Sequence, residues 1–185
     1  MIAIEPQISC VNFMKQGIKN KNKITFIQKA VGENESQKYM YMSSCTKLSS
    51  LSHSWISKVK KTNRFNNETW SDKALVSITT LNTLIKTFST PKFIKIDVEG
   101  YEYEVLQGLT TPVDFISFEF TPEFINNSIN CIKYLETLGN YKFNFSIGES
   151  MEFTSKSWID SQSIIKLLQD IDQNLFGDIY AKQEI

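Results

Sequence analysis

The chain has 185 residues, which is long enough to bury a substantial hydrophobic core within one domain, residues 1–185. Its 20 basic and 20 acidic residues cancel, so no bulk charge attracts nucleic acid or an anionic membrane. No run reaches the roughly 18 consecutive apolar residues of a membrane span, and we expect no signal peptide, because the N-terminus lacks a basic region followed by an apolar run. Three scattered cysteines and one histidine exclude a disulfide framework, a zinc site and a Ser-His-Asp triad, which favours a cytoplasmic protein.

Short strands separated by polar segments are predicted in the first half of the chain. Residues 2–4 are apolar and end at Glu5-Pro6, and a polar connection leads to residues 24–31, which are rich in β-branched side chains. Residues 38–42 and 75–78 predict two further strands. An amphipathic helix is predicted over residues 80–88. It must end before Pro91, because the residue before a proline disfavours the helical conformation.

A long polar segment at about residues 43–72 interrupts this pattern. It is rich in serine, lysine and asparagine, with Trp55 and Trp70 as bulky anchors. We interpret it as a surface excursion, and excursions of this length are usually functional or mobile. Its basic run, interleaved with aromatic residues, is typical of nucleic-acid binding, but the zero net charge favours a solvated loop. Alternatively, the excursion forms a lid or a wall that binds an acceptor molecule.

Strands and helices alternate regularly in the second half. Strands are predicted over residues 93–98, 114–120, 141–147 and 177–181, the first of them buried. Helices are predicted after Gly100, after an N-cap at Thr121, and after Asp160 or Ser161. Alternation of this kind predicts an α/β fold: a doubly wound, mostly parallel sheet with helices on both faces.

Acidic residues stand where three of these strands end, at Glu5, at Asp97 and Glu99, and at Glu119. Ligands of doubly wound proteins bind outside the carboxyl ends of the strands. A carboxylate there accepts hydrogen bonds from the vicinal hydroxyls of a ribose, which suits an adenosine-containing cofactor. The alternative for Glu5 is a capping or solvated acid.

Lys95 and Asp97 lie two residues apart, so their side chains share one face of the strand. A lysine within a buried strand is costly unless it is paired, and Asp97 or Glu119 is the expected partner. A structural ion pair and a functional one both fit this pattern. Gly100 permits a positive φ or a close backbone approach at the turn that follows.

Six segments in this order resemble the FkbM family of methyltransferases: MIAIEP, QKAVGENESQ, SSCTKLSSL, VSITTLNTLI, FIKIDVEGYEYEVLQGL and ISFEF. The resemblance covers residues 1 to about 120 with specific motifs. It implies a class I methyltransferase (Rossmann-like) fold that binds S-adenosylmethionine and methylates a hydroxyl on a sugar, glycolipid or natural product. Members carry a first strand and a Gly-rich turn ahead of the strand that ends in the acid. This sequence begins within that second strand, so we expect a domain that lacks both features.

The resemblance also implies roles for particular residues. Glu5, with Pro6 behind it, would hold the ribose hydroxyls, and the turn Ala30-Val31-Gly32-Glu33 would lie along the adenine. Asp97 would lie beside the methionine end or the transferring methyl group, with Glu99 and Glu119 nearby. The candidate catalytic set is therefore Lys95, Asp97, Glu99 and Glu119.

Methyl transfer from a sulfonium needs positioning and, for a hydroxyl acceptor, a base. Asp97 or Glu99 is the best-placed base. Alternatively, these two acids and Glu119 hold a divalent cation, and oxygen ligands would favour magnesium or calcium over zinc. We do not expect the reaction to require a metal.

Two other classes of function stay open. An acid after a strand also binds the ribose of a nicotinamide cofactor, as in a nucleotide-dependent oxidoreductase. The chain could instead be a truncated or decayed remnant of the methyltransferase fold without catalytic activity. The expected partner is a small-molecule or glycan acceptor, and not nucleic acid. The sequence does not identify the acceptor or the oligomeric state.

Overall fold

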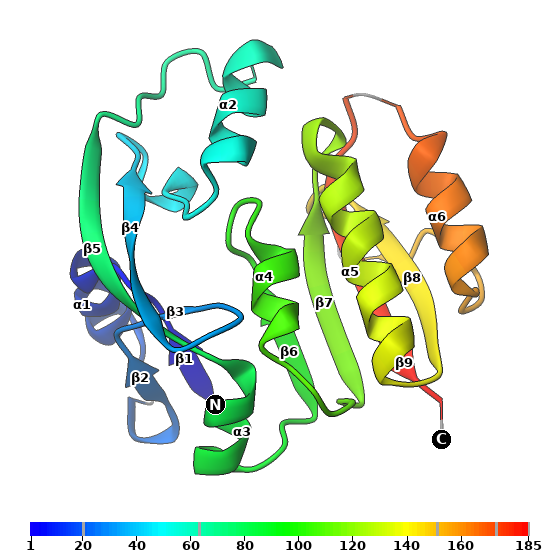
Figure 1. Cartoon of the computed structure of the whole chain (residues 1–185), viewed down its shortest axis with the longest axis horizontal. Coiled ribbons are helices and arrows are strands. Elements are labelled where there is room, and N and C mark those ends of the chain that lie inside the picture. Colours follow the sequence, from blue (N-terminus) through cyan, green and yellow to red (C-terminus); the bar gives the residue numbers. More distant parts are fainter. Residues whose placement is uncertain (20, 63, 151, 173, 185) are drawn as a thin grey trace.

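The computed structural model describes residues 1–19, 21–62, 64–150, 152–172 and 174–184. In this part of the chain the strands form three sheets, ordered β1-β2, β3-β5-β4 and β6-β7-β9-β8 (Figure 1). The strands are β1 (Ile2–Ile4), β2 (Thr25–Ile27), β3 (Ala30–Val31), β4 (Ser36–Met42), β5 (Asp72–Thr79), β6 (Phe93–Ile96), β7 (Phe115–Phe120), β8 (Tyr141–Ile147) and β9 (Gly177–Gln183). The helices are α1 (Ile8–Gly17), α2 (His53–Thr62), α3 (Leu81–Phe88), α4 (Glu102–Gln107), α5 (Ile125–Leu138) and α6 (Ser161–Gln169), with 3-10 turns η1 (Lys21–Lys23), η2 (Thr46–Leu48) and η3 (Pro122–Phe124).

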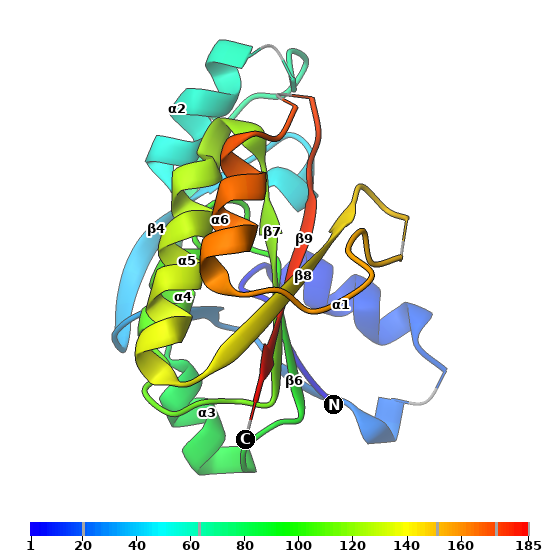
Figure 2. The ribbon, with the colours of Figure 1, turned by 90° about the vertical axis from the view of Figure 1, so that its right-hand side faces the viewer.

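The main core lies between the sheet of β6–β9 and the helices that cover one of its faces. Figure 2 shows α4, α5 and α6 together on one side of this sheet and α1 on the other. Strand β7 contributes Ile116 and Phe118, which are fully buried against apolar residues such as Ile132 of α5. Each such side chain contributes roughly 1.5–3 kcal/mol when it leaves water. The helical spacing of apolar residues in α5 and α6 therefore produces the layered half of the fold.

The sequence predicts a mostly parallel sheet, but the sheets are mixed. β1 with β2, β3 with β5 and β6 with β7 are parallel pairs, but β4 runs antiparallel to β5 and β9 runs antiparallel to both β7 and β8. The prediction of an α/β fold is confirmed. The predicted strand over residues 24–31 is divided between two sheets, because β2 pairs with β1 and β3 pairs with β5.

Strand β6 is half-buried and lies at the edge of its sheet, so the prediction of a buried strand is wrong. Ile96 is buried, whereas Phe93 and Lys95 are exposed. Within the described residues, β7 is the strand that pairs with β6, and β2 is the strand that pairs with β1. The carboxyl ends of β1 and β6 both lead into the region where acids are predicted to gather.

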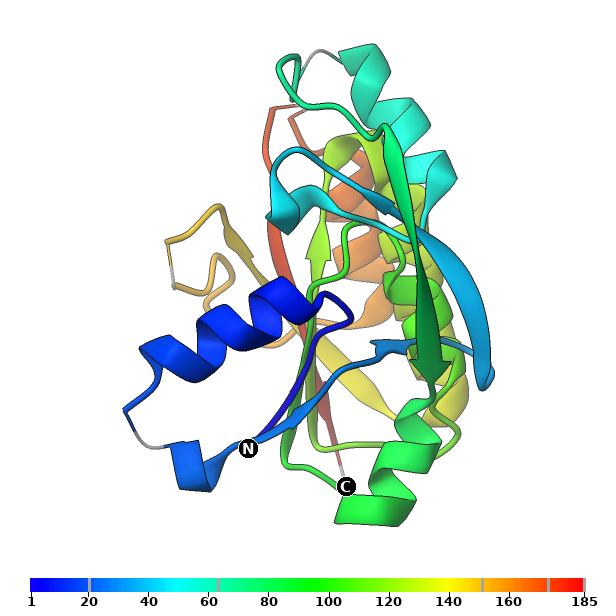
Figure 3. The same ribbon diagram turned by 90° about the vertical axis from the view of Figure 1, so that its left-hand side faces the viewer.

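The segment of residues 43–72 is structured, contrary to its interpretation as a surface excursion. It contains η2 and α2, and Trp55, Ile56 and Val59 of α2 form a buried cluster with Trp70. Figure 3 shows α2 beyond the ends of the long strands β4 and β5. The segment therefore packs a second, smaller core against the acidic turn after β6.

The prediction that a polar connection without a helix joins β1 to β2 is also wrong, because this segment contains α1. Two predicted helix starts differ in detail. Asp160 caps α6 by accepting a hydrogen bond from the Ser163 amide at 2.8 Å, as predicted. Thr121 makes no side-chain capping bond, and a 3-10 turn, η3, separates it from α5.

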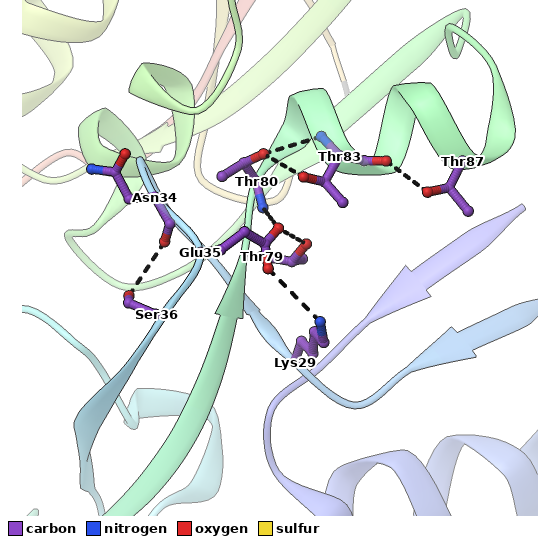
Figure 4. A network of polar contacts seen from close by, with 8 residues as sticks. All are labelled: Lys29, Asn34, Glu35, Ser36, Thr79, Thr80, Thr83 and Thr87. Carbon is purple, nitrogen blue, oxygen red and sulfur yellow. Dashed lines mark hydrogen bonds and ion pairs between the residues drawn. The ribbon is translucent and has the colours of Figure 1, made fainter.

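A polar network connects the turn before β4 to the start of α3 (Figure 4). The Glu35 carboxylate accepts hydrogen bonds from Thr79 Oγ1 at 2.7 Å and from the Thr80 amide at 3.2 Å. The Thr79 hydrogen bond is the main reason that the pKa of Glu35 is lowered. Thr80 in turn caps α3 through the Thr83 amide at 3.0 Å. This network joins the turn before β4 to the end of β5 and the start of α3.

None of the helices in the described part of the chain is both long and apolar enough to cross a membrane.

Candidate functional site

A cavity of about 690 Å³ opens where β1, β3 and β6 end. This volume lies within the range of roughly 300–1,000 Å³ that is usual for small-molecule sites. Its wall is mainly apolar, and its polar groups come from the strand ends and from the segment before α2. The lining residues used below are Glu5, Pro6, Gln7, Lys29, Ala30, Val31, Met40, Lys47, Leu51, Asp97, Glu99 and Tyr101.

Glu5 follows β1 directly and stands at one side of this cavity. Its Oε1 atom accepts a hydrogen bond from the Gln7 amide at 2.7 Å, which fixes the carboxylate after the strand. Gln7 is itself held by Thr46, whose carbonyl accepts from Nε2 at 3.0 Å. Partial burial raises the pKa of Glu5. The carboxylate is therefore both oriented and partly shielded from water.

The opposite side of the cavity is formed by the turn after β6. Glu99 and Gly100 both have positive φ, at 54° and 84°, a left-handed conformation that costs a glutamate free energy. Two groups from the segment before and within α2 hold this turn. Ser50 Oγ donates to the Glu99 carbonyl at 2.7 Å, and the Trp55 side chain packs on Gly100. The contacts with Ser50 and Trp55 thus hold the turn in its strained conformation.

Asp97, Glu99 and Glu119 come together at this turn, with carboxylate oxygens within 4.8 Å of one another. Burial, followed by repulsion from Asp97, raises the pKa of Glu99 to about 8. Burial and repulsion from Glu99 raise the pKa of Glu119 to about 9. Oxygen ligands at this spacing could also hold a divalent cation such as magnesium. The cluster can therefore store protons near neutral pH or share a cation.

Glu102 is a further acid that sequence reasoning missed, although it belongs to the motif that carries the resemblance. It is only 3% exposed, and its Oε1 atom accepts from the Gly100 amide at 3.0 Å. Burial raises its pKa to about 7. It lines a small space together with Trp55 of α2 and Ser128 of α5, so its burial depends on packing that no local pattern in the sequence reveals.

Lys95 forms an ion pair with Asp97, one of its two predicted partners, at 3.8 Å. Its ammonium group also bonds Asp178 of β9, which was not predicted. Asp178 lies opposite Glu119 in the β7–β9 register, so both acids share one face with Lys95. Burial is the largest single influence and lowers the pKa of Lys95, but the Asp178 hydrogen bond and the charges of the neighbouring acids together outweigh it, so the pKa is raised. Lys95 does not line the cavity and orients Asp97 from outside it.

The structure brings the predicted cofactor-binding residues Glu5, Pro6, Ala30, Val31 and Asp97 around one cavity, and Glu99 with them. It places Gly32 and Glu33 outside the lining and Glu119 behind the acidic turn. Gln7 and Tyr101 line the cavity without having been predicted. Tyr101 follows the motif glycine directly, which is the only sequence signal for it.

We expect the free energy of unfolding to fall as the pH rises from about 5 to about 9. Glu99 and Glu119, with pKa values near 8 and 9 instead of 4.5, hold protons that the unfolded chain has released in this window. The slope reaches at most about 1.4 kcal/mol per pH unit for each extra proton. Glu119→Gln mimics the protonated acid, so this variant should exceed the wild type in stability at about pH 9 and match it at about pH 5.

Urea denaturation in EDTA at both pH values measures this difference. The control is Glu152→Gln, at an exposed acid remote from the cluster, which should leave the pH dependence unchanged. Equal pH dependence in the Glu119→Gln variant and the wild type would show that Glu119 is ionised in the folded state at neutral pH.

Together the fold and the site define an α/β protein with one large cavity at its strand ends, a carboxylate after β1 and an acidic cluster after β6. The family model for the methyltransferase FkbM domain matches residues 1–170. The chain therefore belongs to the FkbM methyltransferase family, and the resemblance seen in its motifs is confirmed.

A solved structure gives a second comparison. The chain is similar to the crystal structure of methyltransferase FkbM from Methylobacillus flagellatus KT, with a TM-score of 0.52 and 14% sequence identity. The match covers 97% of this chain and 36% of that chain. This chain thus spans about a third of the length of that structure, and at this identity the likeness shows the fold alone. Comparison with curated proteins gives no match.

Proposed function

We propose that this chain is an S-adenosylmethionine-dependent methyltransferase that methylates a hydroxyl group on a sugar, glycolipid or natural product. The observation that supports the proposal most is that Glu5, the Ala30-Val31 strand and the Asp97–Glu99 turn border one cavity. These segments are far apart in sequence, and a cofactor with a sugar, a base and a charged end needs all three. Family membership supports the reaction class.

The chemistry of the cavity fits this cofactor. The Glu5 carboxylate suits vicinal ribose hydroxyls, and Ala30, Val31 and Leu51 offer an apolar surface for a flat base. The Asp97 carboxylate is complementary to the positive charge of an ammonium or a sulfonium group. Lys29 and Lys47, which also line the cavity, are complementary to a carboxylate.

S-adenosylmethionine, when bound, would supply an activated methyl group that the acceptor oxygen attacks in line, with S-adenosylhomocysteine as the leaving group. In our proposal Glu99 accepts the proton of the acceptor hydroxyl, because its pKa of about 8 is close to the working pH of a general base. Asp97 faces the cofactor, and its ion pair with Lys95 keeps it in place. We also propose that the fold is a variant of the Rossmann-like arrangement of class I methyltransferases. The protein is proposed to act in the cytoplasm.

Glu5→Ala should weaken the affinity for S-adenosylhomocysteine at least tenfold, about 1.4 kcal/mol, because two hydroxyl hydrogen bonds would be lost. Isothermal titration calorimetry of the whole chain measures this affinity. Glu152→Ala, which removes an exposed acid remote from the cavity, is the matched control and should bind as the wild type does.

Unchanged affinity in the Glu5→Ala variant would overturn the assignment of Glu5 to the ribose. If the wild-type chain binds neither S-adenosylmethionine nor S-adenosylhomocysteine, the alternative of a non-catalytic remnant replaces our proposal. Tight binding of a nicotinamide dinucleotide in their place would favour the oxidoreductase alternative.

A further inference from the structure

Two neighbouring serines, Ser49 and Ser50, are hydrogen-bonded to opposite sides of the large cavity. Both are buried, with 5% and 1% of their surface exposed. Ser49 Oγ donates to Gln7 Oε1 at 3.4 Å, and the backbone amide of Gln7 is the group that donates to the Glu5 carboxylate. Ser50 Oγ donates to the carbonyl of Glu99 at 2.7 Å. One dipeptide therefore connects the carboxylate after β1 to the turn after β6.

Each of the two hydroxyls also accepts a hydrogen bond from the backbone of its own segment. The Ser43 amide donates to Ser49 Oγ at 3.0 Å, and the Ser52 amide donates to Ser50 Oγ at 2.8 Å. A serine hydroxyl has a single proton to donate. Because that proton goes to the partner on the cavity side, both hydroxyls have a defined orientation.

The backbone conformation explains why neighbouring residues contact opposite sides. Ser49 is extended, with φ of −70° and ψ of 134°, and Ser50 pairs with Tyr41 of β4 through two backbone hydrogen bonds of 2.9 and 3.0 Å. Successive side chains of an extended segment point in opposite directions. Accordingly, Ser49 lines the cavity, whereas Ser50 is not part of its wall. The pairing with β4 gives the dipeptide a rigid support.

The residues before the dipeptide are held equally firmly. The side-chain amide of Gln7 is bonded at both ends, because its Nε2 atom donates to the Thr46 carbonyl at 3.0 Å while its Oε1 atom accepts from Ser49. Trp70 Nε1 donates to the Leu48 carbonyl at 2.7 Å and ties the segment to the aromatic cluster around α2. A change at either serine therefore acts on the site and not on a loose loop.

We propose that Ser49 and Ser50 are positioning residues that set the spacing between the two ends of the cofactor site. Ser49 acts through Gln7 on Glu5, which faces the ribose. Ser50 acts through the backbone of Glu99 on the turn that carries Asp97, which faces the charged end. This inference rests on the proposed function, because it concerns the binding of the same cofactor.

Two ligands separate the two roles. S-adenosylmethionine and S-adenosylhomocysteine share the ribose, but only the first has a positively charged sulfonium. Isothermal titration calorimetry of the whole chain measures both dissociation constants. Ser49→Ala should weaken the binding of both ligands at least about fivefold and leave the ratio of the two constants within about twofold of the wild type, because the contact it disturbs is common to both.

Ser50→Ala should instead change the ratio of the two constants. Without the Ser50 bond the strained turn relaxes and Asp97 moves away from the sulfonium, while Glu5 keeps the ribose. We expect S-adenosylmethionine to lose at least about fivefold more affinity than S-adenosylhomocysteine. If Ser50→Ala does not fold, Ser50→Cys keeps the volume with a weaker donor and should change the ratio in the same direction.

Ser43→Ala is the matched control. It removes another buried serine hydroxyl of the same segment, one that accepts from the Cys45 amide at 3.2 Å and does not line the cavity. Its two dissociation constants should stay within about twofold of the wild type. Thermal unfolding of the three alanine variants shows how much stability each one loses, and a loss of stability alone leaves the ratio of the constants unchanged.

Two results would overturn the inference while leaving the proposed function intact. One is that the Ser50→Ala variant binds both ligands with the wild-type ratio. The other is that the Ser49→Ala variant binds both ligands as tightly as the wild type does. Failure of the proposed function has a different signature, because the wild-type chain would then bind neither ligand, and the inference would fall with it.

Discussion

Gly100→Ala should destabilise the protein by at least about 3 kcal/mol, because the added methyl group meets both backbone strain and a tightly packed side chain. Gly100 has φ of 84°, and an added Cβ would lie 2.4 Å from both Cβ and Cγ of Trp55. Trp55 is 1% exposed and cannot move aside without opening the cluster around α2. The strained conformation and the overpacking therefore act together.

Thermal unfolding followed by circular dichroism measures this effect, with an expected fall in Tm of roughly 6–12 °C. Two glycines separate its causes. Gly148→Ala carries the positive φ of 52° but meets only Phe176 Cζ at 4.0 Å, so it should lose about 1–3 kcal/mol from backbone strain alone. Gly17→Ala meets nothing within 4 Å and should change stability by less than about 1 kcal/mol. Equal losses for Gly100→Ala and Gly148→Ala would contradict the contact with Trp55.

Glu99→Gln should lower kcat for methyl transfer by about 10²- to 10⁴-fold, the range usual for loss of a general base. The amide has the shape of the acid, so cofactor binding and folding should survive. In the wild type, kcat/KM should rise about tenfold per pH unit up to about pH 8 and then level off, because the ionised base forms as pH passes the pKa of Glu99. Activity and stability are thus expected to change in opposite directions with pH.

Release of S-adenosylhomocysteine with methyl β-D-glucopyranoside as acceptor measures this rate, in EDTA and in magnesium. Asp97→Asn is the matched comparison, because Asp97 lines the same cavity but, in our proposal, faces the cofactor and does not act as the base. It should weaken cofactor binding more than it lowers kcat. A loss below tenfold for Glu99→Gln would show that Glu99 is not the base. Activity that EDTA abolishes and magnesium restores would assign the three carboxylates to a cation instead.

Local patterns predicted those elements whose apolar residues are buried on one clear face. Strands β4, β5 and β7–β9 and helices α3–α6 belong to this group. The pattern failed for α1, because Val11 is its one buried residue while Phe13 is 78% exposed, and Gln7 makes no capping bond. It failed for α2 because Trp55, Ile56 and Val59 are spaced as in a helix but lie among polar residues.

The sequence predicted which acids lie in the site more successfully than it predicted the groups that these acids contact. Acids after β1 and β6 were predicted to meet because parallel strands deliver their carboxyl ends to one edge. Asp178 as partner of Lys95 was not predictable, because it depends on β9 entering antiparallel beside β7. Likewise, the contact of Trp55 with Gly100 joins residues 45 positions apart, which no local spacing encodes.

The order of strands in the larger sheet also bears on how the chain folds during synthesis. β9 follows β6, β7 and β8 in the chain, yet it lies between β7 and β8. Until residues 177–183 leave the ribosome, β8 lacks its partner strand and the edge of β7 that β9 will cover stays open. An open edge invites pairing with other chains. Chaperone dependence should therefore be concentrated in the interval between the emergence of β8 and that of β9.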